Sequence, residues 1–317
     1  MKLKDFLKSS YCKVIDQKSK LYKKYILPIK SKQYQEYNSE AFKEGIKNLN
    51  IHPGDSVFIM LSLDKNYLKT GKKIPVNTIL KDILDYLGSD STIMVLGFSI
   101  NRKKIISKEN IFHVSKTPTE CGILAEILRR KKESVRSIHP IFSAITYGKK
   151  AAEYCASHHE SPYPFDEKSP YYKIMKDGGK YLGIGVGFEA FTPCHMIDDY
   201  YNKDFKHQMY FDKPERFSII NKLGEINEYN YFIRNPATHP GDYDPHYYFQ
   251  LLNIEYKNII LSSGIKLFSF KILDFFNAAV NLYDQKMITI WDTGSFTFFI
   301  SRSLKFLMLT LIKKMIR

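Results

Sequence analysis

Hydrophobic and polar positions predict alternating strands and helices in the first half of the chain. Residues 56–61 are a continuous apolar run with the length of a buried strand, and residues 92–98 are a second one. Between them, residues 75–87 carry apolar side chains at helical spacing, and Gly88 stands where a helix C-cap belongs. A strand, a helix and a strand joined by short turns form a βαβ unit, so we predict a parallel sheet.

The same patterns predict elements further along the chain. The stretch 200–260 is rich in Tyr, Phe, Asn and Asp with alternating apolar positions, which favours antiparallel strands and long loops. We therefore expect an α/β fold with a mixed, largely parallel central sheet flanked by helices, and a sheet-rich insertion at about residues 200–260. Further helices are predicted at residues 39–49, 119–130, 149–158 and 272–283, and further strands at residues 141–147 and 181–186.

Length and composition favour one globular body with basic ends. The chain has 317 residues, of which 44% are hydrophobic, enough for a substantial core. We predict a basic helical N-terminal extension at residues 1–50, a single compact domain at residues 51–300, and a basic amphipathic tail at residues 301–317. No window has the ~18 apolar residues of a membrane span, and the four cysteines lack CxxC spacing. We expect a cytoplasmic protein with reduced thiols.

The charge is concentrated at the two ends of the chain. The formal net charge is +15, and the ends carry most of it: nine lysines against two aspartates in residues 1–30, and five basic residues without an acid in residues 301–317. The remaining body has about +3, so nucleic acid is not the expected partner. The tail also has apolar residues at helical spacing. It either packs on the domain or on a second subunit, or lies as an interfacial helix on an anionic membrane.

Three short segments carry candidate chemical groups. If a helix begins near Pro193, His195 and Asp198 lie three residues apart on one face, where the carboxylate would fix the tautomer of the imidazole. Cys194 next to His195 raises the alternative of a Cys–His nucleophile, but neighbouring helical residues point ~100° apart, which disfavours it. The segments are Thr117-Pro118-Thr119-Glu120-Cys121-Gly122, Arg136-Ser137-Ile138-His139-Pro140 with Ser143, and Thr192-Pro193-Cys194-His195-Met196-Ile197-Asp198.

With Ser169-Pro170 and Gly183-x-Gly185 between the second and third segments, the order and spacing across roughly residues 50–200 resemble the aminoglycoside 3-N-acetyltransferase family. Two positions depart from the family pattern. The chain reads Met60-Leu61-Ser62 where the family typically has His-Ser-Ser, and Asp198 replaces the glutamate that ends the Thr-x-x-His-x-x-Glu signature.

The resemblance implies direct acyl transfer from a coenzyme A thioester, by default acetyl-CoA, to the amine of an amino sugar, without a metal. It implies His195 as the general base, oriented by Asp198 or Glu189, and Thr192 as an oxyanion donor or a contact of the thioester. For His139 a structural role held by hydrogen bonds is the alternative to ligand contact. Hydroxyl groups and an arginine suit the anionic coenzyme, so its expected contacts are Ser62, Thr117, Arg136, Ser137, His139 and Ser143.

The substrate expectation depends on charge. A polycationic aminoglycoside calls for an acidic cleft, whereas a body of about +3 suits an amino sugar carried on a nucleotide diphosphate. We therefore predict N-acylation of a nucleotide-linked amino sugar destined for a surface polysaccharide, with aminoglycoside 3-N-acetylation as the alternative. A non-catalytic membrane-surface binding protein is the alternative from another class. The oligomeric state is left open.

Overall fold

The structure is a computed structural model that describes residues 32–64, 70, 74–99, 111–235 and 243–293. Most of the predicted N-terminal extension and the whole predicted tail lie outside the described residues. Within the described residues, none of the helices has both the length and the apolar character needed to cross a bilayer.

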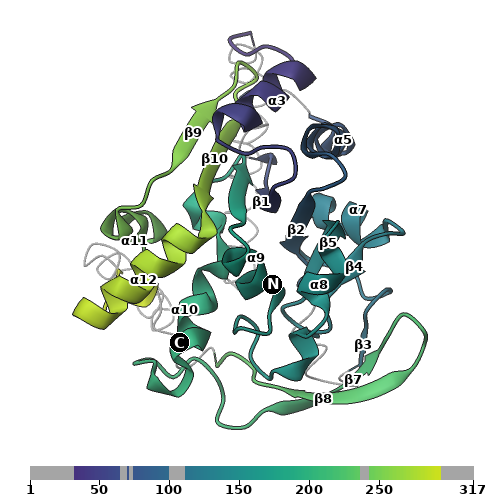
Figure 1. Cartoon of the computed structure of the whole chain (residues 1–317), viewed down its shortest axis with the longest axis vertical. Coiled ribbons are helices and arrows are strands. Elements are labelled where there is room, and N and C mark those ends of the chain that lie inside the picture. The colour runs from purple at the N-terminus through teal and green to yellow at the C-terminus, as the bar shows by residue number, and fades with distance from the viewer. Residues whose placement is uncertain (1–31, 65–69, 71–73, 100–110, 236–242, 294–317) are drawn as a thin grey trace, which may run out of the picture.

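A mixed sheet forms the centre of the molecule (Figure 1). Within the described residues it has seven strands in the order β4-β5-β2-β1-β6-β10-β9. β1 pairs in parallel with β2 and β6, and the outer pairings are antiparallel. The predicted α/β class is confirmed, with parallel pairing limited to the three central strands. The strands are β1 (Ser56–Leu61), β2 (Thr92–Leu96), β4 (Val135–Arg136), β5 (Ala144–Gly148), β6 (Lys180–Ile184), β9 (Lys257–Ile260) and β10 (Lys266–Lys271).

Helices cover both faces of this sheet and define two hydrophobic cores. Successive residues of a strand point to opposite faces, so Val57 and Ile59 of β1 enter one core while Phe58 enters the other. The first core lies under α3 (Ser39–Asn48), α5 (Val76–Leu87) and α7 (Ile123–Arg130). The second is rich in aromatic residues and lies under α8 (Ala151–Cys155), α9 (Pro170–Lys176), α10 (Met196–Tyr201), α11 (Pro245–Leu252) and α12 (Ile272–Lys286).

The predicted sheet-rich insertion forms a small second sheet. β7 (Glu215–Ile220) and β8 (Ile226–Tyr231) are antiparallel, as predicted, and β3 (Ile111–His113) pairs with β7 in parallel. The same stretch also contains α11, which the alternation of apolar positions did not predict. The N-terminus of α11 is capped by Asp244, whose side chain accepts hydrogen bonds from the amides of His246 and Tyr247.

The predicted helix at residues 119–130 begins later than expected. Thr119 precedes the helix: its hydroxyl donates to the carbonyl of Phe98 at 2.9 Å and accepts from the amide of Cys121 at 3.2 Å. Gly122 takes the N-cap position with a φ of 90°, which favours glycine. The predicted helix at residues 149–158 is likewise shorter, and is followed by a 3₁₀ turn. The 3₁₀ turns are η3 (His158–Glu160), η4 (Phe188–Ala190), η5 (Thr192–His195), η6 (Asn202–Asp204) and η7 (Ile290–Asp292).

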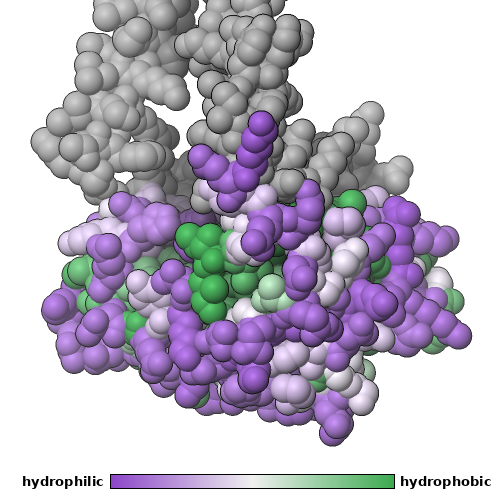
Figure 2. Space-filling view, turned by 90° about the horizontal axis from the view of Figure 1, so that it is seen from above, coloured by the Kyte–Doolittle hydropathy of each residue, from purple (hydrophilic) through white to green (hydrophobic). Residues whose placement is uncertain are grey.

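The surface of the described part of the chain is mainly polar at the end that lies uppermost in Figure 1. Figure 2 shows this face from above: hydrophilic residues predominate, and a group of hydrophobic residues lies near its middle. Scattered exposed apolar side chains are normal for a folded protein, and such a group does not by itself identify a partner.

Candidate active site

The backbone at the end of β6 places the third predicted segment next to the end of β1. The amide of Ser62 donates to the carbonyl of Ile184 at 3.0 Å. Gly185 has a φ of 74°, and a Cβ there would lie 2.1 Å from the carbonyl oxygen of Ser62. Only glycine permits this approach. The chain then passes through η4, η5 and α10 beyond the carboxyl ends of parallel strands, where open α/β sheets commonly bind ligands.

His195 and Asp198 form a hydrogen-bonded pair. His195 ends η5 and Asp198 lies in the first turn of α10, and their Nδ1 and Oδ2 atoms are 3.1 Å apart. The side chain of Asp198 is 2% exposed and that of His195 is 14% exposed. Burial opposes ionisation of Asp198, but the Arg234 guanidinium and the His195 ring hold its pKa below the usual range. An ionised Asp198 keeps the proton on Nδ1, so Nε2 carries the lone pair.

Two residues distant in sequence hold this pair. Arg234 Nη2 donates to Asp198 Oδ2 at 3.0 Å, and Trp291 Nε1 donates to Asp198 Oδ1 at 3.1 Å. The indole of Trp291 also stacks on the His195 ring, with centroids 5.1 Å apart and planes at 13°. Sequence reasoning missed both residues. Trp291 is the only tryptophan of the chain, a signal that could have marked it.

A second carboxyl group lies beside the first. Asp199 accepts a hydrogen bond from the amide of Phe165 at 2.8 Å and another from the hydroxyl of Tyr210. Burial raises the pKa of Asp199 to about 7. The Arg234 guanidinium lies over the rings of Tyr210 and Phe165, at 5.4 and 5.7 Å from their centroids. The described site therefore holds one buried cation, one carboxylate and one carboxyl group that titrates near neutrality.

Glu189 does not orient His195, contrary to one of the two predicted arrangements. Its Oε2 lies 3.9 Å from Nε2 of His246, while Asp198 holds Nδ1 of His195. Thr192 begins the same 3₁₀ helix that His195 ends. With three residues per turn, residues i and i+3 lie on the same side of such a helix. Thr192 is half-buried there.

The arginine of the second predicted segment holds the ends of β2 and β5 together. Arg136 Nε donates to Ser143 Oγ at 2.9 Å, and its other nitrogens donate to the carbonyls of Thr117 and Gly97. The Ser143 hydroxyl itself donates to the Gly97 carbonyl at 2.6 Å. Ser143 is fully buried and its hydrogen bonds are used inside the fold, so its contact with a coenzyme stays a prediction.

Ser137 and His139 are also fully buried. The Ser137 hydroxyl bonds to His158 Nδ1 at 2.7 Å and accepts from the amide of Ala144 at 2.9 Å. His139 Nδ1 accepts from the amide of Phe142 at 3.0 Å. These hydrogen bonds give Ser137 and His139 structural roles, and their contact with a coenzyme stays a prediction. The types of these side chains suit an anion, but the sequence does not show in which direction they point.

The remaining predicted coenzyme contacts, Ser62 and Thr117, are half-buried and stand at sheet ends. Thr117 Oγ1 accepts from the amide of His113 at 2.9 Å. Cys194 is buried, and burial raises its pKa above the ordinary value, which disfavours the thiolate needed for a Cys–His nucleophile. Among the described residues, no three His, Cys, Asp or Glu side chains are grouped so that they could hold a metal.

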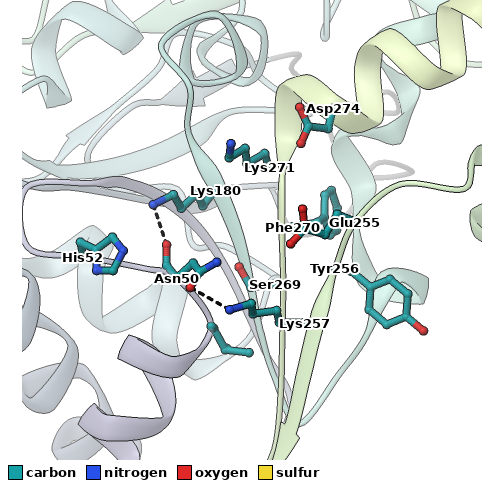
Figure 3. Close-up of a pocket in the computed structure, with 11 residues that line it drawn as sticks. Asn50, His52, Lys180, Glu255, Tyr256, Lys257, Ser269, Phe270, Lys271 and Asp274 are labelled. Atoms are coloured by element: carbon teal, nitrogen blue, oxygen red, sulfur yellow. Dashed lines mark hydrogen bonds between the residues drawn. The ribbon is translucent and has the colours of Figure 1, made fainter.

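A pocket of about 440 Å³ lies at the opposite edge of the sheet, where β6 begins (Figure 3). Lys180 Nζ donates to the carbonyl of Asn50 at 2.7 Å and to Asp55 at 2.6 Å, and Lys257 Nζ donates to Asn50 Oδ1 at 2.8 Å. The pocket is separated from His195 by the length of β6, ~17 Å at 3.3 Å per residue, so it is not part of the His195 site.

The buried histidine His158 predicts acid sensitivity of the fold. Nε2 of His158 donates to the carbonyl of Pro164 at 3.0 Å, and burial lowers its pKa to about 3. Below its ordinary pKa of 6.5 the unfolded chain binds a proton that the folded protein excludes. The free energy of unfolding should therefore fall as pH drops from 6.5 toward 3, by up to about 1.4 kcal/mol per pH unit from this residue.

In His158→Gln, the dependence of unfolding free energy on pH should be shallower by that slope. Urea unfolding at about pH 7.5, 6.5 and 5.5 measures it. His246→Gln, at an exposed histidine, is the control and should leave the slope nearly unchanged. Parallel plots for wild type and His158→Gln would contradict the assignment.

Comparison with known proteins gives the class of this fold and site. The model of the aminoglycoside 3-N-acetyltransferase family matches residues 67–241, more than half of the chain. The chain belongs to this family, which confirms the resemblance and the predicted class of enzyme, an acetyltransferase. No curated protein matches the chain significantly.

Solved structures share the fold across most of the chain. Aminoglycoside acetyltransferase AAC(3)-Xa is 18% identical over 84% of this chain and 98% of its own, with a TM-score of 0.65. AAC-IIIb, solved in a binary complex with CoASH, is 15% identical over 79% and 98%, with a TM-score of 0.63. YokD from Bacillus subtilis is 16% identical over 78% and 99%, with a TM-score of 0.59.

Proposed function

We propose that this chain is a coenzyme A-dependent N-acetyltransferase that acetylates an amine of an aminoglycoside-type amino sugar, with His195 as general base. The observation that carries the proposal is the His195–Asp198 pair, set beyond the carboxyl ends of β1 and β6 in a member of this family. Solved structures with the same fold include AAC-VIa bound to sisomicin and a variant of AAC(3)-IVa in complex with apramycin. These complexes support the aminoglycoside acceptor over the nucleotide-linked one that charge alone favoured.

The chemistry assigned to His195 follows from its tautomer. Acetyl-CoA, when bound, supplies an acetyl group activated as a thioester. Nε2 of His195 takes the proton that the acceptor amine loses when its nitrogen forms the new amide bond, and the same proton can leave with the thiol when the carbon–sulfur bond breaks. The imidazolium formed in this step faces Asp198 through Nδ1–H and Trp291 through its ring. Both contacts favour the charged ring.

Thr192 is the proposed oxyanion donor because it shares the side of η5 on which His195 lies. Ser62 is a proposed coenzyme contact, since its half-buried position at the end of β1 adjoins the backbone that leads to His195. Thr117 is the second proposed coenzyme contact. These residues offer neutral donors, which suit a thioester and its amide-rich arm.

A nucleotide-linked amino sugar is a second candidate acceptor. The specific observation is charge: the body between the basic ends has a formal charge of about +3, which favours an anionic diphosphate over a polycation. The two candidates share the same acetyl transfer and differ only in the acceptor.

The test is thiol release from acetyl-CoA by the full chain, with aminoglycosides, nucleotide-linked amino sugars and no acceptor as the three arms. We expect release that depends on an acceptor amine, highest with an aminoglycoside. Release only with nucleotide-linked sugars would support the second candidate instead. Equal release with and without acceptors, or none at all, would refute acetyl transfer to a sugar amine.

Cys194→Ala should retain substantial activity, because a buried thiol with a raised pKa is not a nucleophile. Transfer should be sequential, with both substrates bound before the thiol leaves. Steady-state kinetics with both substrates varied, and mass spectrometry of the protein mixed with acetyl-CoA alone, measure this. Acetylation of Cys194 in that mixture, together with loss of activity in the alanine variant, would show an acyl-enzyme instead.

A further inference from the structure

A basic pocket of about 270 Å³ opens at the edge of the central sheet beside β4. None of its described lining residues is acidic, and five of them are basic. Arg129 is paired with Glu126 at 2.6 Å, and Lys131 lies 4.0 Å from Glu133. The basic residues of the pocket are Arg129, Lys131, Lys132, Arg136 and Lys222.

Within the described part of the chain, two of these cations are held by neutral oxygens only. Lys222 Nζ donates to the carbonyl of Ser134 at 2.8 Å. Arg136 donates to carbonyls and hydroxyls, as described above, and burial together with the neighbouring Arg129 lowers its pKa to about 10, which still leaves it charged at neutral pH. Their charge is therefore not neutralised by a carboxylate, and an anion entering the pocket would meet it in a partly dehydrated setting.

The pocket also contains an unsatisfied hydroxyl. Ser134 is 4% exposed, and its Oγ has no hydrogen-bond partner among the residues that the structure describes. Buried hydroxyls are nearly always bonded, so an unpaired one in a pocket points to a missing partner. A phosphate oxygen could accept a hydrogen bond from this hydroxyl and from the ammonium and guanidinium groups around it.

The pocket lies toward the end of the sheet where the parallel strands have their carboxyl ends. His195 lies beyond the same end. Arg136 reaches the carbonyl of Gly97, which directly follows β2. His195 follows β6, and β1 pairs in parallel with both β2 and β6. The carboxyl ends of parallel neighbours meet at one edge of a sheet, so a ligand extended along that edge could contact both places.

We propose that the basic pocket binds a phosphate or diphosphate group of a ligand of this enzyme. The inference rests on the proposed function in one respect: the phosphate belongs to coenzyme A or to a nucleotide-linked acceptor. The chemistry is the same for both sources. Several cationic donors and one hydroxyl converge, and none of the lining residues that the structure describes is a carboxylate that would repel the anion.

Isothermal titration calorimetry of the full chain with pyrophosphate, coenzyme A, 3′-dephospho-coenzyme A and uridine diphosphate tests the pocket. We expect Lys222→Ala and Lys132→Ala each to weaken binding of the probe that uses the pocket by about tenfold. Added salt should weaken wild-type binding most. Lys271→Ala, which removes a lysine from the pocket at the opposite edge (Figure 3), is the matched control and should change affinity little.

The pattern of losses identifies the source of the phosphate. Weaker binding of coenzyme A but not of the dephospho form or uridine diphosphate assigns the pocket to the 3′-phosphate. Weaker binding of both coenzyme forms assigns it to the coenzyme diphosphate, and weaker binding of uridine diphosphate alone assigns it to an acceptor nucleotide. Loss for pyrophosphate alone still supports a phosphate site. No binding of any probe to wild type, or equal affinities in wild type and both pocket variants, would overturn the proposal.

These measurements separate the pocket from the proposed reaction. His195→Ala should bind the phosphate probes as wild type does while losing turnover. Normal turnover with unchanged phosphate affinity in the pocket variants would reject the pocket and leave the function standing. If the pocket variants bind phosphate more weakly but the wild-type protein transfers acetyl to no sugar amine, the proposed function is rejected and the phosphate pocket stands. Thermal unfolding of Lys222→Ala checks that its lost contact with Ser134 has not disrupted the fold.

Discussion

Replacing His195 with alanine is expected to lower kcat for acetyl transfer by about 10²–10⁴-fold, the usual contribution of a positioned general base. The reason is that no other described group occupies the position fixed by Asp198 and Trp291. Affinity for coenzyme A should stay near that of wild type, because the base acts on the amine. Steady-state kinetics of thiol release, with calorimetry for coenzyme binding, measure the two effects separately.

Asp198→Asn is the companion variant and should lose less activity than His195→Ala. The amide can still occupy the place of the carboxylate, but it no longer stabilises the imidazolium. Circular dichroism and the fluorescence of Trp291, the only tryptophan, report whether the ring stacking survives. Wild-type turnover in His195→Ala across the pH range would show that the base is another group.

Arg234→Met is expected to destabilise the fold by about 3–5 kcal/mol, the usual cost of leaving one partner of a buried ion pair uncompensated. Asp198 is 2% exposed and Arg234 is the cation that faces it, at 3.0 Å. Arg130→Met is the matched control: Arg130 is 71% exposed in its pair with Glu126 on α7, and its loss should cost less than about 1 kcal/mol. Urea unfolding of the three proteins gives the comparison.

The loss in Arg234→Met should also depend on pH. Without the arginine, burial raises the pKa of Asp198, and the neighbouring Asp199 already has a pKa of about 7. Folded carboxyl groups with raised pKa values bind protons that the unfolded chain does not, so the variant gains stability as pH falls. The difference in unfolding free energy between wild type and the variant should be smaller at about pH 5.5 than at pH 8. A pH-independent gap no larger than that of Arg130→Met would contradict the buried ion pair.

Local sequence determined the elements and the spacing within them. β1, α5 and β2 begin and end within two residues of their predicted limits. A strand face or helix stripe that is buried has apolar residues at regular spacing along the sequence, so these elements can be predicted from consecutive residues. The His195–Asp198 pair was predicted for the same reason. Its partners are three residues apart, and a single turn of helix brings them together whatever the rest of the fold does.

The tertiary structure alone decided what surrounds that pair and which polar groups face outward. Arg234 and Trp291 lie 36 and 93 residues from Asp198 along the chain, and no periodicity relates residues so far apart. Packing around the aromatic core brings these distant segments of the chain together at Asp198. Likewise, Ser137, His139 and Ser143 have side chains that suit an anion, but burial turned them toward backbone groups and His158. Hydrogen-bonding capacity is a property of the residue, whereas its direction depends on long-range packing that a local pattern does not record.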